Sequence, residues 1–368
     1  MQTLKGTPSL TVNLSHLEKN FRTLRTQAGR ELIAVVKANA YGHGAVQCAE
    51  HLIRAGARHL AVASAREALP LLPLFKRQKC NENFTYEDSA LWILGPVHPS
   101  ELRTLLPYRV VLSVHSLCYA KRLSAALDAL GEGLKMSVAL KLETGMHRLG
   151  IETAKEALCV SHLPHLSPYS LYSHLAEANG PPNGRTLGQI SSFLRLSRPI
   201  LREHPHLLTH LSASGGIRSG ISVGTHARAG LALYGVGDTS LLPVGCLSAS
   251  VLTVKRVHRG AGVGYGGFRI GHDTRIAVLG IGYADGLPPS LSGAHIPLKS
   301  GVGTVVGELC MDRTLLDIGE APLREGSRVV LFGKRRGDLE ALAREAGVSP
   351  YVLLSVRSER TERVYVSS

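Results

Sequence analysis

The sequence predicts an α/β protein in two parts, a (β/α)8 TIM-type barrel over residues 1–237 and a separate, mainly β C-terminal domain over residues 238–368. Between residues 31 and 234, short apolar runs alternate with helical stretches, and they supply the eight strands that such a barrel needs. After Gly235 the runs become short, β-rich and punctuated by Gly and Pro, with no long helix between them. A chain of 368 residues is long enough for both parts.

The first expected element is an amphipathic helix capped by Asn13 or Ser15, because Leu14, Leu17 and Phe21 follow at helical spacing. Barrel strands are expected at residues 32–36, 59–63, 91–94, 109–113, 134–142, 169–173, 207–211 and 228–234. Helices are expected between most of them, including 45–55, 65–75, 117–130, 153–160 and 185–203. Residues 76–89 are polar and form a longer connection than most, which predicts a surface insertion of unassigned role.

The C-terminal domain is expected to consist mainly of short strands with two helices near its end. The strands are expected at residues 247–258, 275–281, 302–309, 314–318, 328–332 and 363–366, and the helices at 339–346 and 351–356.

Composition excludes several classes of protein. Mean hydropathy is +0.07, no apolar run approaches the roughly 20 residues of a membrane span, and residues 1–9 lack a signal-peptide core, so a cytoplasmic protein without a membrane partner is expected. The six cysteines are scattered, which argues against disulfides and structural zinc. The net charge is +14, but the basic residues are dispersed and aromatic residues are only 5%, so no nucleic-acid partner is expected.

The histidines at 204, 206 and 210 have a spacing that suggests metal ligands. His206 and His210 are expected on a strand rather than on one helical face, and no converging partner is evident from elsewhere in the chain. No metal site is therefore expected.

A lysine ends the first expected barrel strand. Burial makes an ammonium costly, so Lys37 is a candidate for a depressed pKa or for conversion to an uncharged imine. The alternative is that Lys37 reaches solvent from the strand end. Tyr41 lies just beyond, with a phenol that could reach a phosphate, and Gly42 and Gly44 allow the backbone to turn.

Other candidate residues follow later barrel strands, and in a barrel the ends of these strands meet at one mouth. Lys141 and Arg148 follow the fifth strand, and His174 follows the sixth. The connections after the last two strands are the usual phosphate site of such barrels, and hydroxyl or amide donors are available there from Ser214, Gly215, Gly216, Gly230 and Leu231.

The decapeptide VVKANAYGHG at residues 35–44 resembles the signature of the alanine racemase family, enzymes that use pyridoxal 5'-phosphate. Further resemblances are KLETGMHRLG at 141–150, LYSH at 171–174 and ARAGLALYG at 227–235. By this resemblance, Lys37 carries the cofactor and is a catalytic base, and Tyr41 contacts the phosphate. The resemblance extends over nearly the whole chain.

The same resemblance implies roles for the other polar residues of the barrel. Arg148 would bind the phenolic oxygen of the cofactor and the substrate carboxylate, and Lys141 corresponds to a lysine that can be carbamylated. Arg228 would face the pyridine nitrogen, supported by His174 and His210. Because an arginine keeps its proton, the ring nitrogen would stay largely unprotonated, which weakens the cofactor as an electron sink and disfavours transamination.

In the C-terminal domain, GVGYGG at 262–267 has no following helix and is therefore a poor nucleotide-binding loop. By the family resemblance, Tyr265 is the second catalytic base, donated by the partner subunit of a homodimer. Tyr283 in GYADG would lie at the entry, Met311 in CMD would contribute to the carboxylate pocket, and Tyr351 would reach the phosphate or guard the site.

The implied function is a homodimeric racemase with shared active sites that interconverts L-alanine and D-alanine and supplies D-alanine for peptidoglycan. Alternatives are a broader-specificity amino-acid racemase, a related barrel decarboxylase that pairs the pyridine nitrogen with a carboxylate, and a non-catalytic cofactor carrier. The chain departs from the family at Ala213, where many relatives carry Asn, and at RTER in 360–363, where Arg-Val-Pro is more usual. Substrate breadth and carbamylation of Lys141 stay open.

Overall fold

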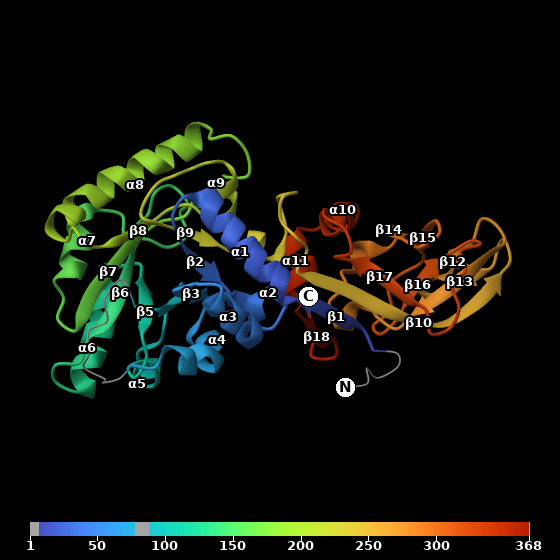
Figure 1. Ribbon diagram of the computed structural model, residues 1–368, viewed down its shortest axis with the longest axis horizontal. Helices are drawn as coiled ribbons and strands as arrows, with labels where there is room; N and C mark the ends of the chain where they lie inside the picture. The colour runs from blue at the N-terminus through green and yellow to red at the C-terminus, as the bar shows by residue number, and fades with distance from the viewer. Residues whose placement is uncertain (1–6, 78–87, 368) are drawn as a thin grey trace. The chain divides into compact units, whose positions relative to one another are not determined.

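The computed structural model describes residues 7–77 and 88–367 and divides the chain into two compact units (Figure 1). We call Phe21–Asn39 with Ala45–Leu233 the barrel unit. Met1–Asn20, Ala40–Gly44 and Tyr234–Ser368 form the C-terminal unit. Most of the insertion expected at 76–89 lies outside the described residues. No helix within the described ranges is long and apolar enough to cross a membrane.

The barrel unit contains a closed barrel of eight parallel strands, which confirms the fold expected from the alternating pattern. It closes between the first and last strands, where Leu32 pairs with Ala227. Side chains on both faces of the strands are covered, which explains why these strands read as apolar runs without alternation. The strands are β2 (Glu31–Val35), β3 (His59–Val62), β4 (Ala90–Ile93), β5 (Val110–Val114), β6 (Met136–Lys141), β7 (Leu166–Tyr172), β8 (Leu208–His210) and β9 (His226–Ala229).

Helices cover the outside of the barrel; α6, α7 and α8 are seen along its outer side in Figure 1. The first helix, α1 (Leu14–Ala28), is capped by Asn13, whose Oδ1 accepts a hydrogen bond from His16 N at 3.0 Å. The others are α2 (Lys37–Tyr41), α3 (Ala45–Arg54), α4 (Ala65–Ala68), η1 (Leu69–Phe75), η2 (Pro99–Glu101), α5 (Leu102–Leu105), α6 (Leu117–Leu130), α7 (Ala154–Ser161), α8 (Gly184–Glu203), α9 (Ser214–Arg218) and η3 (Leu231–Tyr234).

Three local expectations for the barrel unit were wrong in detail. The helix expected at 65–75 changes from α-helix to a 3-10 helix at Leu69, because Pro70 and Pro73 interrupt α-helical hydrogen bonding. The last strand ends at Ala229, since the amides of Gly230 and Ala232 turn to the Ser214 hydroxyl. His206 is exposed in a turn that precedes β8, rather than lying on that strand.

The C-terminal unit is built on a sheet in the strand order β14-β15-β16-β13-β10-β1-β18, with β17 paired to β10. Strand β1 (Ser9–Asn13), next to the edge strand β18, comes from the start of the chain and was not expected; it pairs antiparallel with β10 and parallel with β18. The other strands are β10 (Gly245–Val257), β11 (Gly262–Val263), β12 (Phe268–Arg269), β13 (Thr274–Leu279), β14 (His295–Pro297), β15 (Val302–Val305), β16 (Thr314–Asp317), β17 (Arg328–Phe332) and β18 (Glu362–Val366). Short helices are η4 (Tyr265–Gly267), η5 (Tyr283–Asp285), η6 (Pro289–Leu291), α10 (Asp338–Glu345) and α11 (Pro350–Ser355).

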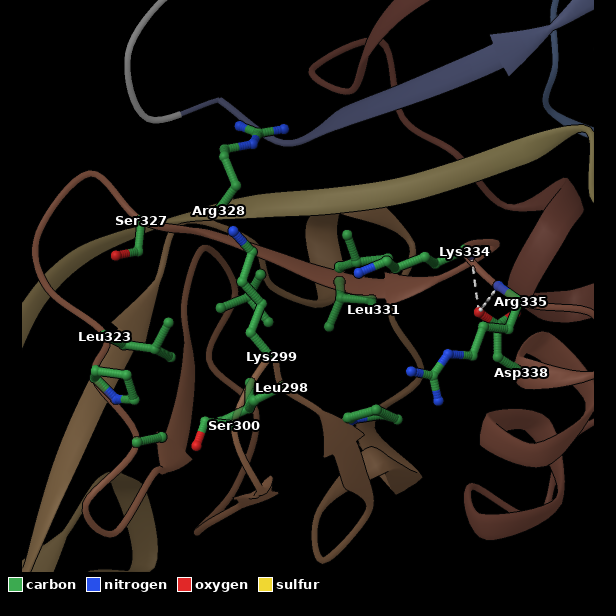
Figure 2. A pocket seen from close by; sticks show the side chains of 15 residues that line it. Leu298, Lys299, Ser300, Leu323, Ser327, Arg328, Leu331, Lys334, Arg335 and Asp338 are labelled. Carbon is green, nitrogen blue, oxygen red and sulfur yellow. Dashed lines mark hydrogen bonds between the residues drawn. The ribbon is translucent and has the colours of Figure 1, made fainter.

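The C-terminal unit also holds a pocket of about 290 Å³ beside β17 (Figure 2). Its wall is apolar, with Leu298, Leu323 and Leu331, and its rim carries Lys299 and Arg335. None of the candidate catalytic or cofactor-binding residues lines this pocket.

Candidate functional site

The barrel unit brings its candidate residues to the carboxyl ends of the strands. Lys37 follows β2, Lys141 ends β6, His174 follows β7, Ser214 follows β8 and Arg228 lies in β9. The strands are parallel, so these positions share one mouth of the barrel.

Lys37 lies in a cationic environment. Burial lowers the pKa of its amine, and the charges of Arg148 and Arg228 lower it further, whereas Glu67 acts in the opposite direction. A lowered pKa leaves more of the amine neutral at a given pH, and the neutral amine is the nucleophile and the base.

A left-handed turn follows Lys37 directly. Ala38, Asn39, Ala40 and Tyr41 all have φ between 50° and 54°, a conformation that costs L-residues on the order of 1–2 kcal/mol each. Glu67 helps to hold this turn, because its carboxylate accepts hydrogen bonds from Ala38 N at 3.1 Å and from Ala63 N at 2.8 Å.

Glu67 was missed in the sequence. Ser64 and Glu67 have the spacing of a helix capping box, and Ser64 does accept a hydrogen bond from Glu67 N. The Glu67 carboxylate, however, reaches two strand-end amides, one of them beside Lys37, and no local pattern indicates that contact.

Lys141 is almost fully buried and lies among cations. Burial, Arg148 and Arg228 together lower the pKa of its amine to about 8, with Glu143 opposing them. Its Nζ lies 5.9 Å from the centre of the Tyr172 ring. No carboxylate of the described residues forms an ion pair with it, so this buried amine lacks a direct anionic partner.

Arg228 is held by neutral acceptors. One terminal nitrogen, Nη2, donates to the carbonyls of Ser173 at 2.7 Å and Leu211 at 3.1 Å and to His174 Nδ1 at 3.0 Å. The other, Nη1, donates to His210 Nδ1 and to the His210 carbonyl. Burial lowers the pKa of the guanidinium to about 10, so it remains a cation at neutral pH.

The two histidines that contact Arg228 are neutral. Burial and the charge of Arg228 lower the pKa of His174 to about 3 and lower the pKa of His210 well below its usual value. Because each Nδ1 accepts from Arg228, the proton of each ring is on Nε2. Arg228 therefore donates hydrogen bonds to both imidazoles, and neither ring takes its proton at neutral pH.

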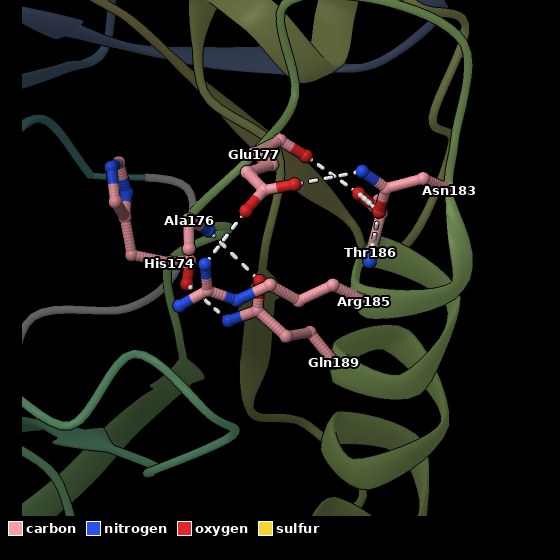
Figure 3. A network of polar contacts seen from close by, with 7 residues as sticks. All are labelled: His174, Ala176, Glu177, Asn183, Arg185, Thr186 and Gln189. Carbon is pink, nitrogen blue, oxygen red and sulfur yellow. Dashed lines mark hydrogen bonds and ion pairs between the residues drawn. The ribbon is translucent and has the colours of Figure 1, made fainter.

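Figure 3 shows how the segment after β7, which carries His174, is tied to α8. Gln189, which is 2% exposed, donates from Nε2 to the His174 carbonyl at 3.1 Å and accepts from Ala176 N at 2.8 Å. Thr186 donates to the carbonyl of Glu177 at 2.6 Å, and Glu177 pairs with Arg185 at 2.7 Å. These residues were also missed, although Thr186 and Gln189 lie three positions apart on the buried face of α8, where apolar residues are usual.

Ser214, Gly230 and Leu231 form one connected group. Ser214 Oγ accepts from Gly230 N at 3.0 Å and from Ala232 N at 3.3 Å, and Leu231 lies between these two amides. Gly215 and Gly216 open α9 in close contact with backbone and side-chain atoms: a Cβ on Gly215 would lie 2.7 Å from Ala178 O. At the N-cap of this helix, Ala213 supplies no side-chain hydrogen bond.

In the C-terminal unit, Tyr41 and Tyr351 belong to one aromatic cluster. The Tyr41 ring is centred 5.0 Å from that of Tyr234 and 6.0 Å from that of Tyr351. The next residue, Gly42, cannot carry a side chain, because its Cβ would lie 2.3 Å from Leu354 O; its own carbonyl accepts from Arg363 Nε at 2.7 Å. The segment that carries Tyr41 is thereby held at Gly42 by the backbone of Leu354 and by the Arg363 side chain.

Tyr265 lies at the tip of the β11–β12 hairpin. The hairpin turns through Gly264 and Gly266, which have φ of 68° and 71°, and it leaves the Tyr265 side chain 67% exposed. Such a projecting phenol is accessible to a second molecule.

Tyr283 and Met311 are brought together by backbone hydrogen bonds. Tyr283 N donates to Cys310 O at 3.1 Å and Ala284 N to Met311 O at 3.0 Å, and both side chains are exposed. Arg360 supports this region, since it pairs with Asp285 at 3.0 Å and with Asp312 at 2.7 Å.

Comparisons with known proteins agree with this arrangement. Residues 12–238 match the family model described as alanine racemase, N-terminal domain, and residues 244–365 match alanine racemase, C-terminal domain. An alanine racemase of Desulforamulus reducens is 32% identical over 374 residues, covering 96% of this chain and 98% of the relative.

Solved structures are similar over the same length. Alanine racemase from Streptomyces coelicolor superposes with a TM-score of 0.85 at 30% identity, covering 98% of each chain. Alanine racemase from Bartonella henselae, with covalently bound pyridoxal phosphate, superposes with a TM-score of 0.84 at 26% identity, covering 98% of this chain and 99% of that one.

Proposed function

Since the chain belongs to the alanine racemase family and is an amino-acid racemase, we propose that Lys37 and Tyr265 are its two bases, that pyridoxal phosphate is its cofactor and that alanine is its substrate. The observation that carries this proposal is the buried Arg228, whose hydrogen-bond partners among the described residues are carbonyls and neutral imidazoles, at the same barrel mouth as Lys37. D-Alanine made in this way would serve peptidoglycan synthesis.

The residues present fit the cofactor. A Lys37 amine with a lowered pKa can hold an aldehyde covalently. Ser214 Oγ accepts from the Gly230 and Ala232 amides, so its own O–H is left to donate to a phosphate, and the amide of Leu231 lies beside it. When bound, pyridoxal phosphate stabilises negative charge at the substrate Cα and so lowers the barrier to removing its proton. Tyr41 and Tyr351 are proposed as further phosphate contacts from the C-terminal unit.

Arg228 distinguishes racemisation from the alternative activities. A buried arginine whose hydrogen-bond partners are neutral acceptors keeps its proton, so it presents a donor and never an acid to a ring nitrogen. A decarboxylase of the related architecture would be expected to have a carboxylate in this place. An arginine in place of that carboxylate therefore favours the racemase.

Lys141 is proposed as the site of carbamylation. The reaction joins the neutral amine to carbon dioxide and releases one proton, and a pKa lowered to about 8 makes the neutral amine accessible. The product would replace a buried cation by an anion beside Arg148, which removes the unfavourable interaction that now lowers the pKa of Lys141. Arg148 would then be oriented to bind the substrate carboxylate. By the family resemblance, Met311 would contribute to the carboxylate pocket and Tyr283 would lie at its entry.

The two bases are proposed to serve opposite faces of the substrate Cα. Lys37 Nζ takes or returns the proton on one face, and Tyr265 Oη does so on the other. Tyr265 projects from its hairpin and is mostly exposed, which suits a group that completes the site of a partner subunit. We therefore propose a homodimer with shared active sites, in which the C-terminal domain from about residue 238 contributes Tyr265.

The test is a conversion assay with purified protein loaded with pyridoxal phosphate. We expect interconversion of L-alanine and D-alanine, a visible absorption band from the bound cofactor, and loss of both in Lys37→Ala. Other small amino acids assayed in parallel establish substrate breadth. A Lys37→Ala protein that keeps the band and the activity would show that another residue holds the cofactor.

A further inference from the structure

Two histidines and a glutamate that the catalytic site does not use lie together on the barrel unit. One ligand atom from each of His162, Glu203 and His204 lies within 4.8 Å of the other two. His162 is the C-cap of α7, Glu203 is the last residue of α8, and His204 is the C-cap of α8. The His162 and Glu203 side chains are 57% and 44% exposed, so an ion can reach them from solvent.

The hydrogen bonds of the cluster leave the lone pair of one His204 ring nitrogen available to a metal. The Ser161 hydroxyl donates to the Leu158 carbonyl at 2.9 Å, so towards His204 Nε2, at 3.1 Å, it acts as the acceptor. The proton of His204 is then on Nε2, and Nδ1 keeps its lone pair. Holding the second ring nitrogen in this way is the usual manner in which proteins orient a metal-binding histidine.

The backbone of both helices favours a cation at this place. The 8-residue α7 and the 20-residue α8 both end at the cluster, so the negative ends of their two helix dipoles are near the same point. His162 Nε2 is also in hydrogen-bond contact with Glu203 Oε1, an arrangement in which a metal ion can replace the shared proton.

From these observations we propose that His162, Glu203 and His204 form a binding site for a divalent transition-metal ion of the Zn²⁺ class. Two imidazole nitrogens and one carboxylate oxygen suit Zn²⁺, Ni²⁺ or Cu²⁺ better than Ca²⁺ or Mg²⁺, which prefer oxygen ligands. Three protein ligands leave further positions for water, as expected for an exposed site.

The place of this site in the barrel determines its effect. α7 and α8 run back along the barrel, and their ends lead into the starts of β7 and β8. The site therefore lies at the amino ends of the strands, at the opposite end of the barrel from Lys37 and Arg228. Bound metal joins the ends of two neighbouring helices, so it stabilises the barrel and leaves turnover unchanged.

The site could not be predicted from the sequence, because His162 lies at the end of α7 and the other two ligands lie at the end of α8. His204 attracts attention through its spacing to His206 and His210, yet His210 contacts Arg228 and His206 is exposed in a turn. Its partner His162 is 41 positions from Glu203.

The experiment is a Zn²⁺ titration of the holoenzyme, freed of unbound cofactor, against a chromophoric chelator, with thermal unfolding in parallel. We expect saturable binding of one ion per chain at this site and a higher unfolding midpoint that a chelator reverses. His162→Gln and Glu203→Gln should each weaken binding by at least ~100-fold, since loss of a ligand exceeds the 10–100-fold effect of losing a supporting residue. His206→Gln is the matched control and should bind Zn²⁺ normally.

Several results would overturn the proposal. The first is the absence of saturable Zn²⁺ binding. The second is a Zn²⁺ affinity that is unchanged in both His162→Gln and Glu203→Gln while circular dichroism shows that both variants are folded. The third is Zn²⁺ binding that is lost in His206→Gln. A midpoint that is unaffected by bound Zn²⁺ would contradict the proposed bridge between the two helices. Racemase turnover measured in the same samples should not respond to Zn²⁺, and a Zn²⁺-dependent change in turnover that His162→Gln removes would also contradict the proposal.

Discussion

At the scale of single residues, the reactivity of Lys37 is a balance between neighbours of opposite charge. Arg148 and Arg228 destabilise its ammonium form, and Glu67 stabilises it. Glu67 also holds the amide of Ala38, so the same carboxylate affects both the charge of the lysine and the backbone that follows it. Burial is the largest influence, and it favours the neutral amine.

Removing these charges should move the pKa of Lys37 in opposite directions. Glu67→Gln removes the anion that raises the pKa, so capture of pyridoxal phosphate by cofactor-free protein should begin at lower pH than in the unmodified protein. Arg148→Gln removes a cation that lowers the pKa, so capture should begin at higher pH. The measurement is the rate of appearance of the visible band as a function of pH. Shifts in the same direction for both variants would contradict the assigned balance.

How many of these residues could be predicted from the sequence depends on whether their roles are local. Some roles could be predicted because the residues lie in contiguous motifs that resemble the family. These residues are Lys37, Tyr41, Arg148 and Arg228. Glu67 and Gln189 act through single hydrogen bonds to distant backbone. A capping-box spacing, or a polar residue on a buried helix face, does not by itself indicate which distant group the side chain will contact.

At the scale of elements, the connection after β7 links α8, on the outside of the barrel, to His174 in the candidate site. Gln189 of α8 accepts from Ala176 N and donates to the His174 carbonyl, and His174 Nδ1 accepts from Arg228. A series of hydrogen bonds therefore links α8, through the connection after β7, to Arg228.

Gln189→Leu should therefore destabilise the barrel and disturb Arg228. The Ala176 amide and the His174 carbonyl, both part-buried, would lose their partner, which costs about 1–3 kcal/mol of unfolding free energy for each group left unpaired. Leu187→Ala on the exposed face of the same helix is the control and should change stability by less than about 0.5 kcal/mol. Chemical denaturation measures both, and equal effects would remove the special role of Gln189.

Element boundaries were predicted well where periodicity decided them and poorly where distant contacts did. The eight barrel strands and α6 follow from local pattern. The place of β1 in the C-terminal sheet, between β10 and β18, depends on pairing with strands more than 200 positions away. The end of β9 depends on Ser214, because the Gly230 and Ala232 amides donate to its hydroxyl rather than to a neighbouring strand.

At the scale of the whole molecule, buried neutral histidines should make the protein sensitive to acid. Burial lowers the pKa of His59 to about 3 and of His43 and His226 to about 4. In the unfolded chain these imidazoles titrate near 6.5, so the unfolded state binds more protons below that pH. Their contribution is complete above pH 6.5 and is lost as the pH falls towards 4.

Each such imidazole should cost roughly 2 kcal/mol of stability between pH 6.5 and pH 5. His59→Phe should reduce the slope of unfolding free energy against pH, because it removes one titrating group from the barrel interior. His206→Gln, at an exposed position, should leave the slope unchanged. Stability that does not fall between pH 6.5 and pH 5 would contradict the neutral state of these histidines.

Assembly can be tested by mixing two inactive chains. If Tyr265 serves the partner subunit, a dimer of Lys37→Ala with Tyr265→Phe contains one site with both bases and one with neither. After random exchange of an equal mixture, half of the dimers are mixed and half of their sites are complete, so activity should return to about a quarter of the unmodified value. Verified mixed dimers without activity would show that both bases come from one chain.

The most direct test of the two-base reaction is α-deuterium exchange from each pure enantiomer of alanine by Tyr265→Phe protein with bound cofactor. Phe keeps the ring and removes only the hydroxyl, and the exposed position of Tyr265 means that the fold should not change. One rigid side chain cannot serve both faces of Cα, so exchange should fall strongly for one enantiomer, L-alanine by family resemblance, and much less for D-alanine, which Lys37 serves. Exchange from both enantiomers at rates near those of the unmodified enzyme would contradict a catalytic role for Tyr265.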